Sequence, residues 1–505
     1  MKMNVGYLLE NAASRYPKKL ALVYEGKEYT YGEYNQRVNR LSNFLRAQGI
    51  GKGEKVATLM NNSNFQVEIY LACAKIGAVF TPLNYRQKER ELEYVIQHSE
   101  ARTLFFFPEF STEADYLKNR CPITLMVQVG GGLVPAALDY EDVLRSSSDE
   151  EPGLPITITE VDPCQLLYTS GTTGRPKGVI LSHGNVLWNV INSIFIRGDR
   201  NEDRFLLVGP LYHVAGLNSH FTTKIAVGAT VVIMKSFKAQ EMMELIESYK
   251  ITMVSGAPSL YHILFQLPEL ESYDTRSVRS CSVGASICPQ ETKYRLTKLF
   301  RHASGVFDVY GATEATCNIS ILPAVDWERK PGSVGKGLLF TRLRIVDRIG
   351  ADVPTGSIGE IICCGPNVME RYYKDEEATC EALRGGWLHT GDLGKMDEEG
   401  YLYIVGRLKD TIISGGENIY PREVEEILYT HPKIQEAAVI GVPDPKWGET
   451  VKAVVVLSPG QMATEEEIIF YCKQKIAPYK APKLVDFVSE LPKTASGKID
   501  KKILR

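Results

Sequence analysis

The stretch that decides the fold is Leu166-Leu-Tyr-Thr-Ser-Gly-Thr-Thr-Gly-Arg-Pro-Lys-Gly-Val-Ile-Leu-Ser-His183. Apolar runs at Cys164 to Tyr168 and at Val179 to Leu181 predict two short buried strands. The segment between them is rich in hydroxyl side chains and glycine and also contains a lysine: Thr169, Ser170, Gly171, Thr172, Thr173, Gly174, Lys177 and Gly178. Because glycines let backbone N–H groups converge and lysine adds a point charge, such a loop is suited to bind an anion.

Two other interpretations of this loop are weaker. Clusters of glycine, serine and threonine between strands are usually flexible surface loops, but here the hydroxyls begin at the strand end and a lysine lies among the glycines. A P-loop NTPase motif ends in Gly-Lys-Ser/Thr, whereas Lys177 follows Pro176 and precedes Gly178. We therefore expect a phosphate-binding loop of another kind.

The run Tyr168-Thr-Ser-Gly-Thr-Thr-Gly-Arg-Pro-Lys-Gly178 resembles the signature of the adenylate-forming ligase superfamily. This superfamily groups AMP-forming acyl-CoA synthetases, peptide-synthetase adenylation domains and luciferase. The resemblance implies ATP, Mg²⁺ and coenzyme A as cofactors. It further implies a catalytic Thr169 beside the metal, and phosphate-binding roles for Thr169, Ser170, Gly171, Thr172, Thr173 and Lys177.

A second segment with chemical potential is Asp308-Val-Tyr-Gly-Ala-Thr-Glu314, which follows a predicted strand. Taken alone, it is typical of a strand end with a solvated acid. The resemblance implies instead that Tyr310 stacks on adenine, Thr313 contacts the α-phosphate, and Glu314 is a catalytic ligand of Mg²⁺. The other nucleotide contacts implied here are Asp308, at the adenine amino group, Val309, where many members have glycine, Gly311 and Ala312.

Two further segments resemble nucleotide-binding parts of the same superfamily. Val283-Gly-Ala-Ser286 matches the adenine wall through Gly284, Ala285 and Ser286, although an ordinary strand-end turn explains so short a match equally well. Thr390-Gly-Asp-Leu-Gly394, followed by Gly400-Tyr401 and Gly406-Arg407, matches the ribose clamp. A carboxylate suits this role because it accepts hydrogen bonds from both vicinal hydroxyls. The resemblance gives that role to Asp392 and Arg407.

The last hundred residues contain three implied functional positions. Lys409 lies two residues after Arg407, where the superfamily has its hinge; without the resemblance it belongs to a charged linker. Gly415 and Gly416 match the loop that borders the pantetheine arm of coenzyme A, and they fit an ordinary turn as well. Lys498, in Pro492-Lys-Thr-Ala-Ser-Gly-Lys-Ile499, matches the catalytic lysine of adenylation, whereas a terminal lysine is usually only solvated.

The segment Pro210-Leu-Tyr-His-Val-Ala-Gly216 resembles the wall of the acyl-binding pocket. His213 is either a catalytic pocket residue or a packed core histidine. No Asp or Glu occurs from Gly209 to Lys224. An α-amino acid substrate needs a buried carboxylate to pair its ammonium group, so this absence favours a simple carboxylic acid.

Composition is that of an ordinary large enzyme. The chain has 505 residues, 44% hydrophobic and 24% charged, with a formal net charge of −3, so no basic field attracts nucleic acid. No Cys or His spacing suits zinc, and the cysteines are expected to be free thiols. Because we find no signal peptide, membrane-length apolar run or peroxisomal C-terminus, we expect a cytoplasmic protein without an integral membrane segment. A homo-oligomer is compatible with these features.

Strand and helix patterns alternate up to about residue 330, which predicts an α/β fold of mostly parallel sheets covered by helices. Beyond Gly332, strands with Gly/Pro turns predict a small β-barrel or antiparallel sheet, and a compact α+β unit follows Gly406-Arg-Leu-Lys-Asp410. We divide the chain into a nucleotide- and acyl-binding domain (1–406), a hinge (407–409) and a mobile C-terminal lid (410–505).

The resemblance implies an ATP-dependent carboxylate–CoA ligase that acts in two steps through an acyl-adenylate. The acid is a medium-chain fatty, alicyclic or aromatic acid, and the sequence does not select among them. Three alternatives stay open: a stand-alone adenylation enzyme that loads a carrier protein, a luciferase-like oxygenase, and a non-catalytic nucleotide-binding protein.

Overall fold

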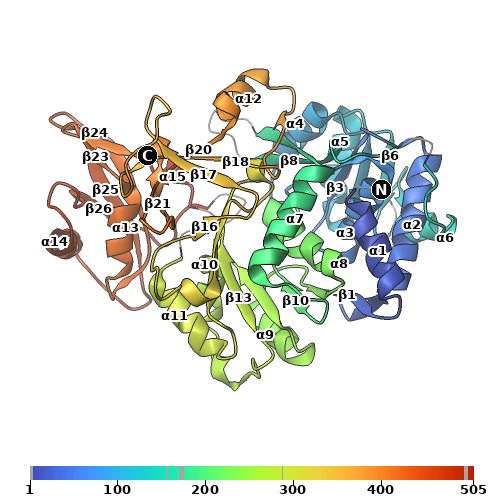
Figure 1. The fold of residues 1–505 in the computed structure, drawn as a ribbon, viewed down its shortest axis with the longest axis horizontal. Coiled ribbons are helices and arrows are strands. Elements are labelled where there is room, and N and C mark those ends of the chain that lie inside the picture. Colours follow the sequence, from blue (N-terminus) through green and yellow to red (C-terminus); the bar gives the residue numbers. More distant parts are fainter. Residues whose placement is uncertain (1–3, 133, 155–156, 170–175, 287, 494–498) are drawn as a thin grey trace.

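The computed structural model describes residues 4–132, 134–154, 157–169, 176–286, 288–493 and 499–505. The predicted site residues Ser170, Gly171, Thr172, Thr173 and Lys498 lie outside these ranges. The molecule has two large sheets, a small sheet, and a C-terminal unit that Figure 1 shows at the opposite end from the N-terminus.

The first large sheet is parallel in its centre and antiparallel at both edges. Its strands in spatial order are β16 (Lys336–Gly337), β15 (Ser320–Leu322), β14 (Val306–Tyr310), β13 (Ser280–Gly284), β12 (Met253–Gly256), β10 (Arg204–Leu207), β11 (Thr230–Ile233), β1 (Leu20–Tyr24) and β2 (Lys27–Thr30). The carboxyl ends of β13 and β14 therefore lie side by side and bring two predicted nucleotide-binding segments together.

The second large sheet contains the two strands predicted around residue 170. Its strands in spatial order are β19 (Arg371–Tyr372), β9 (Lys177–Ser182), β8 (Pro163–Thr169), β4 (Val79–Pro82), β3 (Lys55–Leu59), β5 (Thr103–Phe106), β6 (Leu125–Gln128) and β7 (Leu138–Asp139). From β8 to β7 the sheet is parallel, and its apolar strands are buried on both faces as parallel strands usually are.

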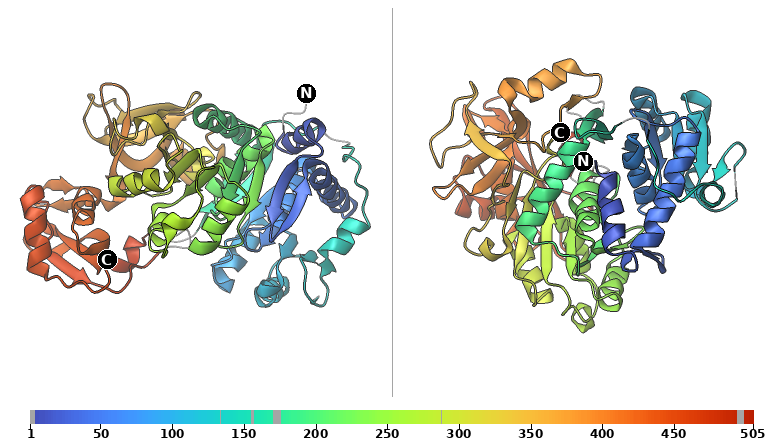
Figure 2. Two further views of the ribbon diagram at one scale, coloured as in Figure 1. Left: turned by 90° about the horizontal axis from the view of Figure 1, so that it is seen from below. Right: turned by 45° about the vertical axis from the view of Figure 1, so that its right-hand side comes forward.

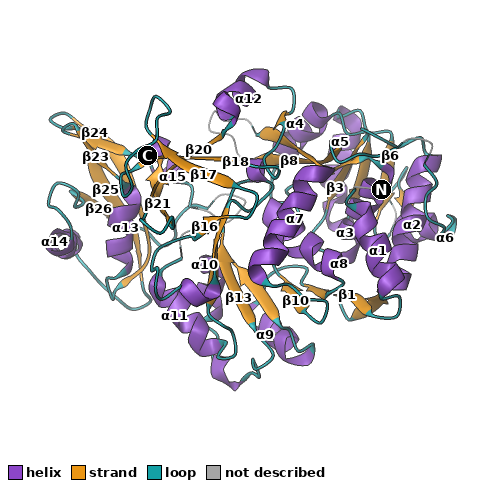
Figure 3. Cartoon of the chain, in the orientation of Figure 1, coloured by secondary structure: helices purple, strands orange, loops and turns teal. Residues whose placement is uncertain are grey.

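Helices cover the two large sheets, as Figure 3 shows. The α-helices are α1 (Gly6–Arg15), α2 (Tyr31–Ala47), α3 (Asn64–Ile76), α4 (Glu89–Ser99), α5 (Ser111–Arg120), α6 (Tyr140–Arg145), α7 (His183–Arg197), α8 (Thr223–Val227), α9 (Ala239–Ser248), α10 (Pro258–Leu264), α11 (Gln290–Leu299) and α12 (Glu376–Ala382). A π-helix, η2 (Ala215–Thr222), precedes α8; the 3-10 turns are η1 (Pro108–Phe110), η3 (Leu270–Ser272), η4 (Thr313–Ala315), η5 (Ala324–Asp326) and η6 (Arg384–Gly386). One apolar cluster joins side chains of both sheets, including Phe80 and Phe205.

The region beyond Gly332 forms a four-stranded antiparallel sheet, one of the two forms expected for it. Its strands are β17 (Arg342–Val346), β18 (Gly359–Cys364), β20 (Leu388–Met396) and β21 (Leu402–Arg407). Pairing runs in one path from β17 to β21, and β21 also pairs with the segment at Ser333 through a bridge to Tyr403.

The C-terminal unit has its own sheet and its own apolar core. The sheet contains β23 (Glu417–Ile419), β22 (Ile412–Ser414), β25 (Gly448–Leu457), β24 (Ile434–Asp444) and β26 (Leu484–Phe487), and the helices are α13 (Pro421–Tyr429), α14 (Glu465–Lys475) and α15 (Lys501–Leu504). A 3-10 turn, η7 (Leu408–Asp410), connects it to β21. Figure 2 shows this unit at one end of the molecule. The boundary at 406–410 stays a prediction.

Two expected features of the whole chain can be compared with the structure. All ten cysteines are free, as expected for a chain without structural disulfides. Among the helices of the described ranges, none combines the length and apolar character that a bilayer crossing requires.

A buried ion pair anchors α2 to α3, which lies next to the second sheet. Arg37 on α2 makes two hydrogen bonds to Glu68 on α3, at 2.9 and 3.1 Å, and the Glu68 side chain is fully enclosed. The Tyr140 hydroxyl donates a further hydrogen bond to Glu68 at 2.7 Å. On the same helix, Arg40 pairs with Asp149, whose side chain is 40% exposed.

We expect Arg37→Met to lower the free energy of unfolding by about 3–5 kcal/mol, because it leaves the Glu68 carboxylate buried without its cation. The matched variant Arg40→Met removes a solvent-exposed pair and should cost less than about 1 kcal/mol. Urea titrations of both variants beside wild type measure the difference. Equal losses of unfolding free energy in the two variants would show that the burial of Glu68 does not contribute to the cost of removing Arg37.

Candidate active site

The loop at residue 170 is held by a hairpin of β8 and β9. The strands pair antiparallel, with Thr169 opposite Lys177 and Tyr168 opposite Gly178. A Cβ atom at Gly178 would lie 2.9 Å from the end of the Leu166 side chain, so a larger residue there would displace that side chain. Thr169 and Lys177 thus stand together at the open end of the hairpin, on either side of the loop that lies outside the described residues.

Tyr372 connects this hairpin to Glu314. It pairs with Val179 through β19, and its ring lies 5.0 Å from the Lys177 ammonium nitrogen. Its hydroxyl donates a hydrogen bond of 2.8 Å to Glu314 Oε1. Burial, together with the nearby Glu314 carboxylate, raises the pKa of Tyr372, so the hydroxyl keeps the proton that it donates. Lys177 and Glu314 are therefore brought to one site.

The turn that carries Thr313 and Glu314 is fixed by close backbone contacts. A Cβ atom at Gly311 would clash with the Cys317 carbonyl oxygen. The backbone at Gly311 therefore passes too close to Cys317 for any residue with a side chain. Asn367 donates from its amide to the carbonyls of Ala315 and Asn318, at 3.2 and 2.9 Å. Both Thr313 and Glu314 stay partly accessible, as residues that contact a ligand must be.

The described residues of this site do not form a metal centre of their own, but they suit a metal ion that binds together with a nucleotide. Among the described residues, no group of three or more His, Cys, Asp or Glu side chains is arranged to hold a metal ion. Mg²⁺ usually keeps several waters and binds one or two carboxylates plus substrate phosphates. Glu314, with Thr169 as a second oxygen donor, fits that pattern.

The structure brings together the two residues predicted to bind ribose, and their role toward ribose stays a prediction. Asp392 on β20 and Arg407 on β21 are directly opposite each other, and Arg407 Nε lies 3.2 Å from Asp392 Oδ1. The Tyr310 hydroxyl donates a hydrogen bond of 2.8 Å to Asp392 Oδ2. Burial and the Asp392 carboxylate raise the pKa of Tyr310, so its hydroxyl remains a donor. The presumed adenine-stacking and ribose-binding residues thus form one unit.

The predicted adenine wall lies beside the strand that ends in Tyr310. In register, Val283 is opposite Asp308 and Gly284 is opposite Val309. Ala285 has a positive φ of 67° and, like Ser286, is exposed, so the chain turns outward at this point. Asp308 is buried, and its carboxylate lies 2.6 Å from the ammonium group of Lys293 on α11.

His213 lies two residues before the π-helix η2 and is partly accessible. Its Nδ1 atom accepts a hydrogen bond of 3.2 Å from the backbone N–H of Ala215, which caps the start of the helix. Nothing in this geometry makes it a proton-transfer group. Its place at the start of η2 agrees with a wall position, and its catalytic role stays a prediction.

The C-terminal unit contributes three described positions. Lys409 is exposed within η7. Gly415 and Gly416 form the turn between β22 and β23 with φ values of 60° and 87°, and a Cβ at Gly415 would meet the Trp447 ring at 2.8 Å. Both glycines are exposed. Their role toward coenzyme A stays a prediction.

The segment around Lys498 is described only at its two ends. Lys493 and Ile499 pair as an antiparallel bridge. Lys493 also lines a small hollow with Ser259 and His262 of α10, which follows β12 of the first large sheet. This hollow thus lies between α10 of the large domain and the C-terminal unit, near Lys493.

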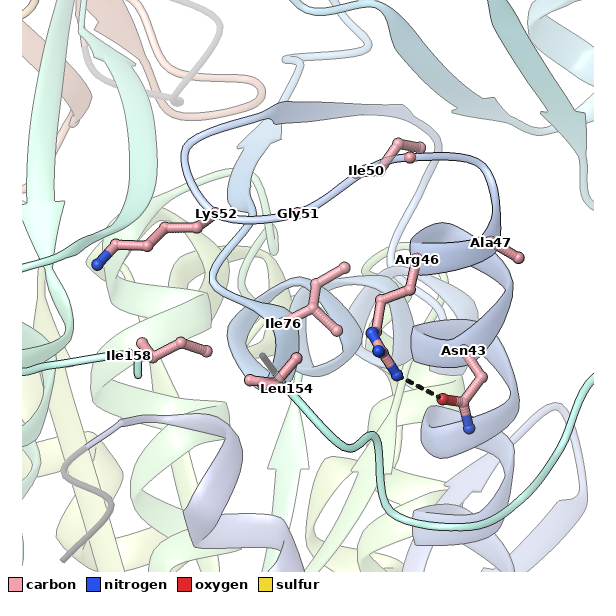
Figure 4. A pocket seen from close by; sticks show the side chains of 10 residues that line it. Asn43, Arg46, Ala47, Ile50, Gly51, Lys52, Ile76, Leu154 and Ile158 are labelled. Atoms are coloured by element: carbon pink, nitrogen blue, oxygen red, sulfur yellow. Dashed lines mark hydrogen bonds between the residues drawn. The ribbon is translucent and has the colours of Figure 1, made fainter. Parts of the chain in front are cut away.

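An open hollow elsewhere on the surface lacks catalytic chemistry. Figure 4 shows it between the end of α2 and the loop before β3, with Ile76, Leu154 and Ile158 on its floor and wall. The hydrogen bond drawn there joins Arg46 to Asn43 at 3.5 Å. None of the predicted site residues lines it, so we do not assign it to the reaction.

The structure thus arranges the predicted residues in two groups. The first contains Thr169, Lys177, Thr313 and Glu314, and the second contains Tyr310, Asp392 and Arg407. Sequence reasoning missed Tyr372, which joins the first group, and Lys293, which neutralises Asp308. Tyr372 stands in Arg371-Tyr-Tyr-Lys374 without a motif. Only its pairing with β9 reveals its position.

Comparison with known proteins agrees with this geometry. A model of the AMP-binding enzyme family matches residues 9–373, and a model of the AMP-binding enzyme C-terminal domain matches residues 423–498. A feruloyl-CoA synthase of Amycolatopsis sp is 39% identical over 486 residues, 96% of this chain and 94% of the relative. An indoleacetate–CoA ligase of Aromatoleum aromaticum is 37% identical over 505 residues, 100% and 98% of the two chains.

Among solved structures, ATP-bound MatB from Rhodopseudomonas palustris superposes with a TM-score of 0.91 at 32% identity, covering 100% of this chain and 98% of that one. The similarity therefore extends through both the large domain and the C-terminal unit. With the site geometry and both family models in agreement, the chain belongs to the AMP-binding enzymes, the adenylate-forming ligase superfamily that its residue 168–178 motif resembles.

Proposed function

We propose that this enzyme is an ATP-dependent carboxylate–CoA ligase that acts through an acyl-adenylate. The observation that carries the proposal is the assembly of Tyr310, Asp392 and Arg407 beside the turn that bears Glu314. The Tyr310 ring can stack on a base, and the Asp392 carboxylate can accept hydrogen bonds from ribose hydroxyls. The Glu314 carboxylate can bind a metal ion that is held by phosphates. Relatives named as feruloyl-CoA synthase and indoleacetate–CoA ligase support the same class of reaction.

In the first step a carboxylate oxygen of the acid attacks the α-phosphorus of ATP, and the bond to pyrophosphate breaks. A free carboxylate is a poor acyl donor because its charge is delocalised, whereas the mixed anhydride has a good leaving group. Lys177, Thr169 and Thr313 bind and orient the phosphates through charge and hydroxyl donors. When bound through Glu314, Mg²⁺ neutralises phosphate charge. Lys498 stabilises the charge that develops on the α-phosphoryl oxygens.

In the second step the CoA thiol attacks the carbonyl carbon of the adenylate and AMP leaves. The lid turns about Lys409, withdraws Lys498 and presents the Gly415–Gly416 turn to the thiol. The positive φ values and exposure of these glycines support close approach by a narrow pantetheine arm.

The acid is a medium-chain fatty, alicyclic or aromatic carboxylic acid without an α-ammonium group. The buried carboxylates before the segment 209–224 are both paired: Asp203 pairs with Arg279, and Asp199 pairs with both Arg197 and Lys224. A carboxylate already shared by two cations is a poor partner for a third. This supports the expectation drawn from the absence of acidic residues there.

A pyrophosphate-release assay with Mg²⁺·ATP and a panel of carboxylic acids tests the proposal. Acid-dependent release followed by a CoA thioester supports it. Release without transfer to CoA, but with transfer to a carrier protein, identifies the stand-alone adenylation enzyme. Light or O₂ uptake after adenylation identifies the oxygenase, and no release with any acid leaves the non-catalytic nucleotide-binding protein.

We expect Lys498→Ala to slow adenylation by roughly 10²–10³, the effect of one lost donor to the transition state. Thioester formation from supplied acyl-adenylate should persist, because that step does not use the lysine. Pyrophosphate release and acyl-adenylate consumption, measured separately, test the division. Equal slowing of both half-reactions would refute the assignment of Lys498 to the adenylation step alone.

We expect wild type to prefer ATP over 2′,3′-dideoxy-ATP, and Asp392→Ala to lower this preference by roughly 10- to 100-fold, because each charge-assisted hydrogen bond contributes about 1.5–3 kcal/mol. Tyr310→Phe keeps the ring and should retain most of the preference. Asp397→Ala is the matched control, since Asp397 pairs with Lys330 at 2.7 Å instead. Values of kcat/KM for the two nucleotides measure the effect, and an unchanged ratio in Asp392→Ala would remove the ribose role.

A further inference from the structure

Helix α4 contacts both ends of the loop at residue 170. The Tyr94 hydroxyl donates a hydrogen bond of 3.3 Å to the carbonyl oxygen of Pro176. His98 Nδ1 lies 2.8 Å from the Tyr168 hydroxyl. Tyr94 and His98 are four residues apart, so they share one face of the helix. This face therefore contacts the two residues that directly precede the predicted phosphate-binding positions at the ends of the hairpin.

The His98 ring is oriented by three aromatic contacts. It stacks on Tyr94 with ring centroids 5.4 Å apart and an interplanar angle of 24°. It also makes T-shaped contacts with Tyr168 and Tyr373, each with centroids 5.7 Å apart. Stacked and edge-to-face pairs are the arrangements that aromatic rings prefer. The three contacts therefore fix the ring with Nδ1 directed at the Tyr168 hydroxyl.

The end of α4 also contacts the segment directly after β19. The Tyr373 hydroxyl donates a hydrogen bond of 2.7 Å to Glu100, and the Lys374 ammonium group lies 3.0 Å from the same carboxylate. The Tyr373 backbone N–H donates to the carbonyl of Gly178 at 2.7 Å. One helix end thus joins the two ends of the loop to the strand that contains Tyr372, the partner of the proposed magnesium ligand.

Both partners of the contact between His98 and Tyr168 are neutral at pH 7. Burial, and then the charge of Lys374, lowers the pKa of His98 below its usual value. Burial also raises the pKa of the Tyr168 hydroxyl. The hydroxyl therefore keeps its proton and donates it to Nδ1, which leaves the imidazole proton on Nε2. Because the contact adds no charge to the site, its effect on bound phosphates is one of position.

We propose that His98 is a positioning residue for adenylation, which acts through the Tyr168 hydroxyl and holds Thr169 opposite Lys177 for the phosphates of ATP. This inference rests on the proposed ligase function, and it gives a role in the first step to α4. The acyl-adenylate has already lost the β- and γ-phosphates. A loss of positioning must therefore slow pyrophosphate release and spare thioester formation.

The variant His98→Leu removes the hydrogen bond and keeps an apolar side chain. We expect its kcat/KM for ATP in pyrophosphate release to fall by about 10-fold or more, because small misplacements of reacting groups cost up to about 100-fold in rate. Thioester formation from supplied acyl-adenylate should stay unchanged. His98→Asn returns an amide to the position of Nδ1 and should recover part of the lost activity.

A double-mutant cycle tests whether His98 acts through its tyrosine partner. Tyr168→Phe removes the same hydrogen bond from the other side, so the combined variant should lose no more kcat/KM than the more affected single variant. The matched control is Gln97→Leu, in the same turn of α4. The Gln97 amide bonds to Glu93 and to the carbonyl of Arg120 instead, so both half-reactions should stay unchanged.

Melting temperatures show whether each variant is folded, and His98→Asn and Tyr168→Phe keep the test decisive if His98→Leu is not. Equal slowing of both half-reactions, an unchanged kcat/KM for ATP, or additive losses in the double variant would overturn the proposal. If wild type releases no pyrophosphate with any acid, the ligase function fails. Calorimetry with Mg²⁺·ATP then decides the positioning role, because His98→Leu should still weaken binding of ATP more than binding of AMP.

Discussion

The hydrogen bond from Tyr372 to Glu314 joins two parts of the site that are 58 residues apart in the chain. Tyr372 is held by two features of the second large sheet: its pairing with Val179, and the contact of its ring with Lys177. Glu314 belongs to a turn after the last parallel strand of the first large sheet. This buried, protonated hydroxyl therefore links the two large sheets at the site, in addition to the apolar cluster that joins them. Because its pKa is raised, this contact does not titrate near neutral pH.

Arg407 occupies a second point of connection. It is the last residue of β21, it pairs with Asp392, and η7 begins at the next residue. In the proposed mechanism, a rotation of the C-terminal unit about η7 starts beside the Asp392–Arg407 pair. The Tyr310 hydroxyl bonds to the same Asp392 carboxylate, so this pair is also joined to the first large sheet. The proposed ribose site therefore adjoins the junction between the large domain and the C-terminal unit.

The sequence predicted those parts of the fold and site that depend on local pattern. The strands around residue 170 are where the apolar runs indicated them. Asp392 and Arg407 were paired from their motifs, and the structure places them opposite each other. Tyr372 and Lys293 escaped prediction because their positions arise from contacts between distant segments. Beyond Gly332 the turn spacing predicted antiparallel strands, and the structure has them.

The buried ion pairs around η2 show that the role of a charged side chain depends on the residues with which it pairs. Judged only by its burial and its place in the sequence, Asp199 is a carboxylate near the segment 209–224 that would suit an ammonium group. Its pairing with Arg197 and Lys224 reverses this conclusion, because the surroundings then carry an excess positive charge. A buried charge in excess is stabilised best by hydrogen-bond acceptors or an anion. The contacts made by Asp199, and not its presence in the sequence, therefore decide whether its carboxylate is available to a substrate cation.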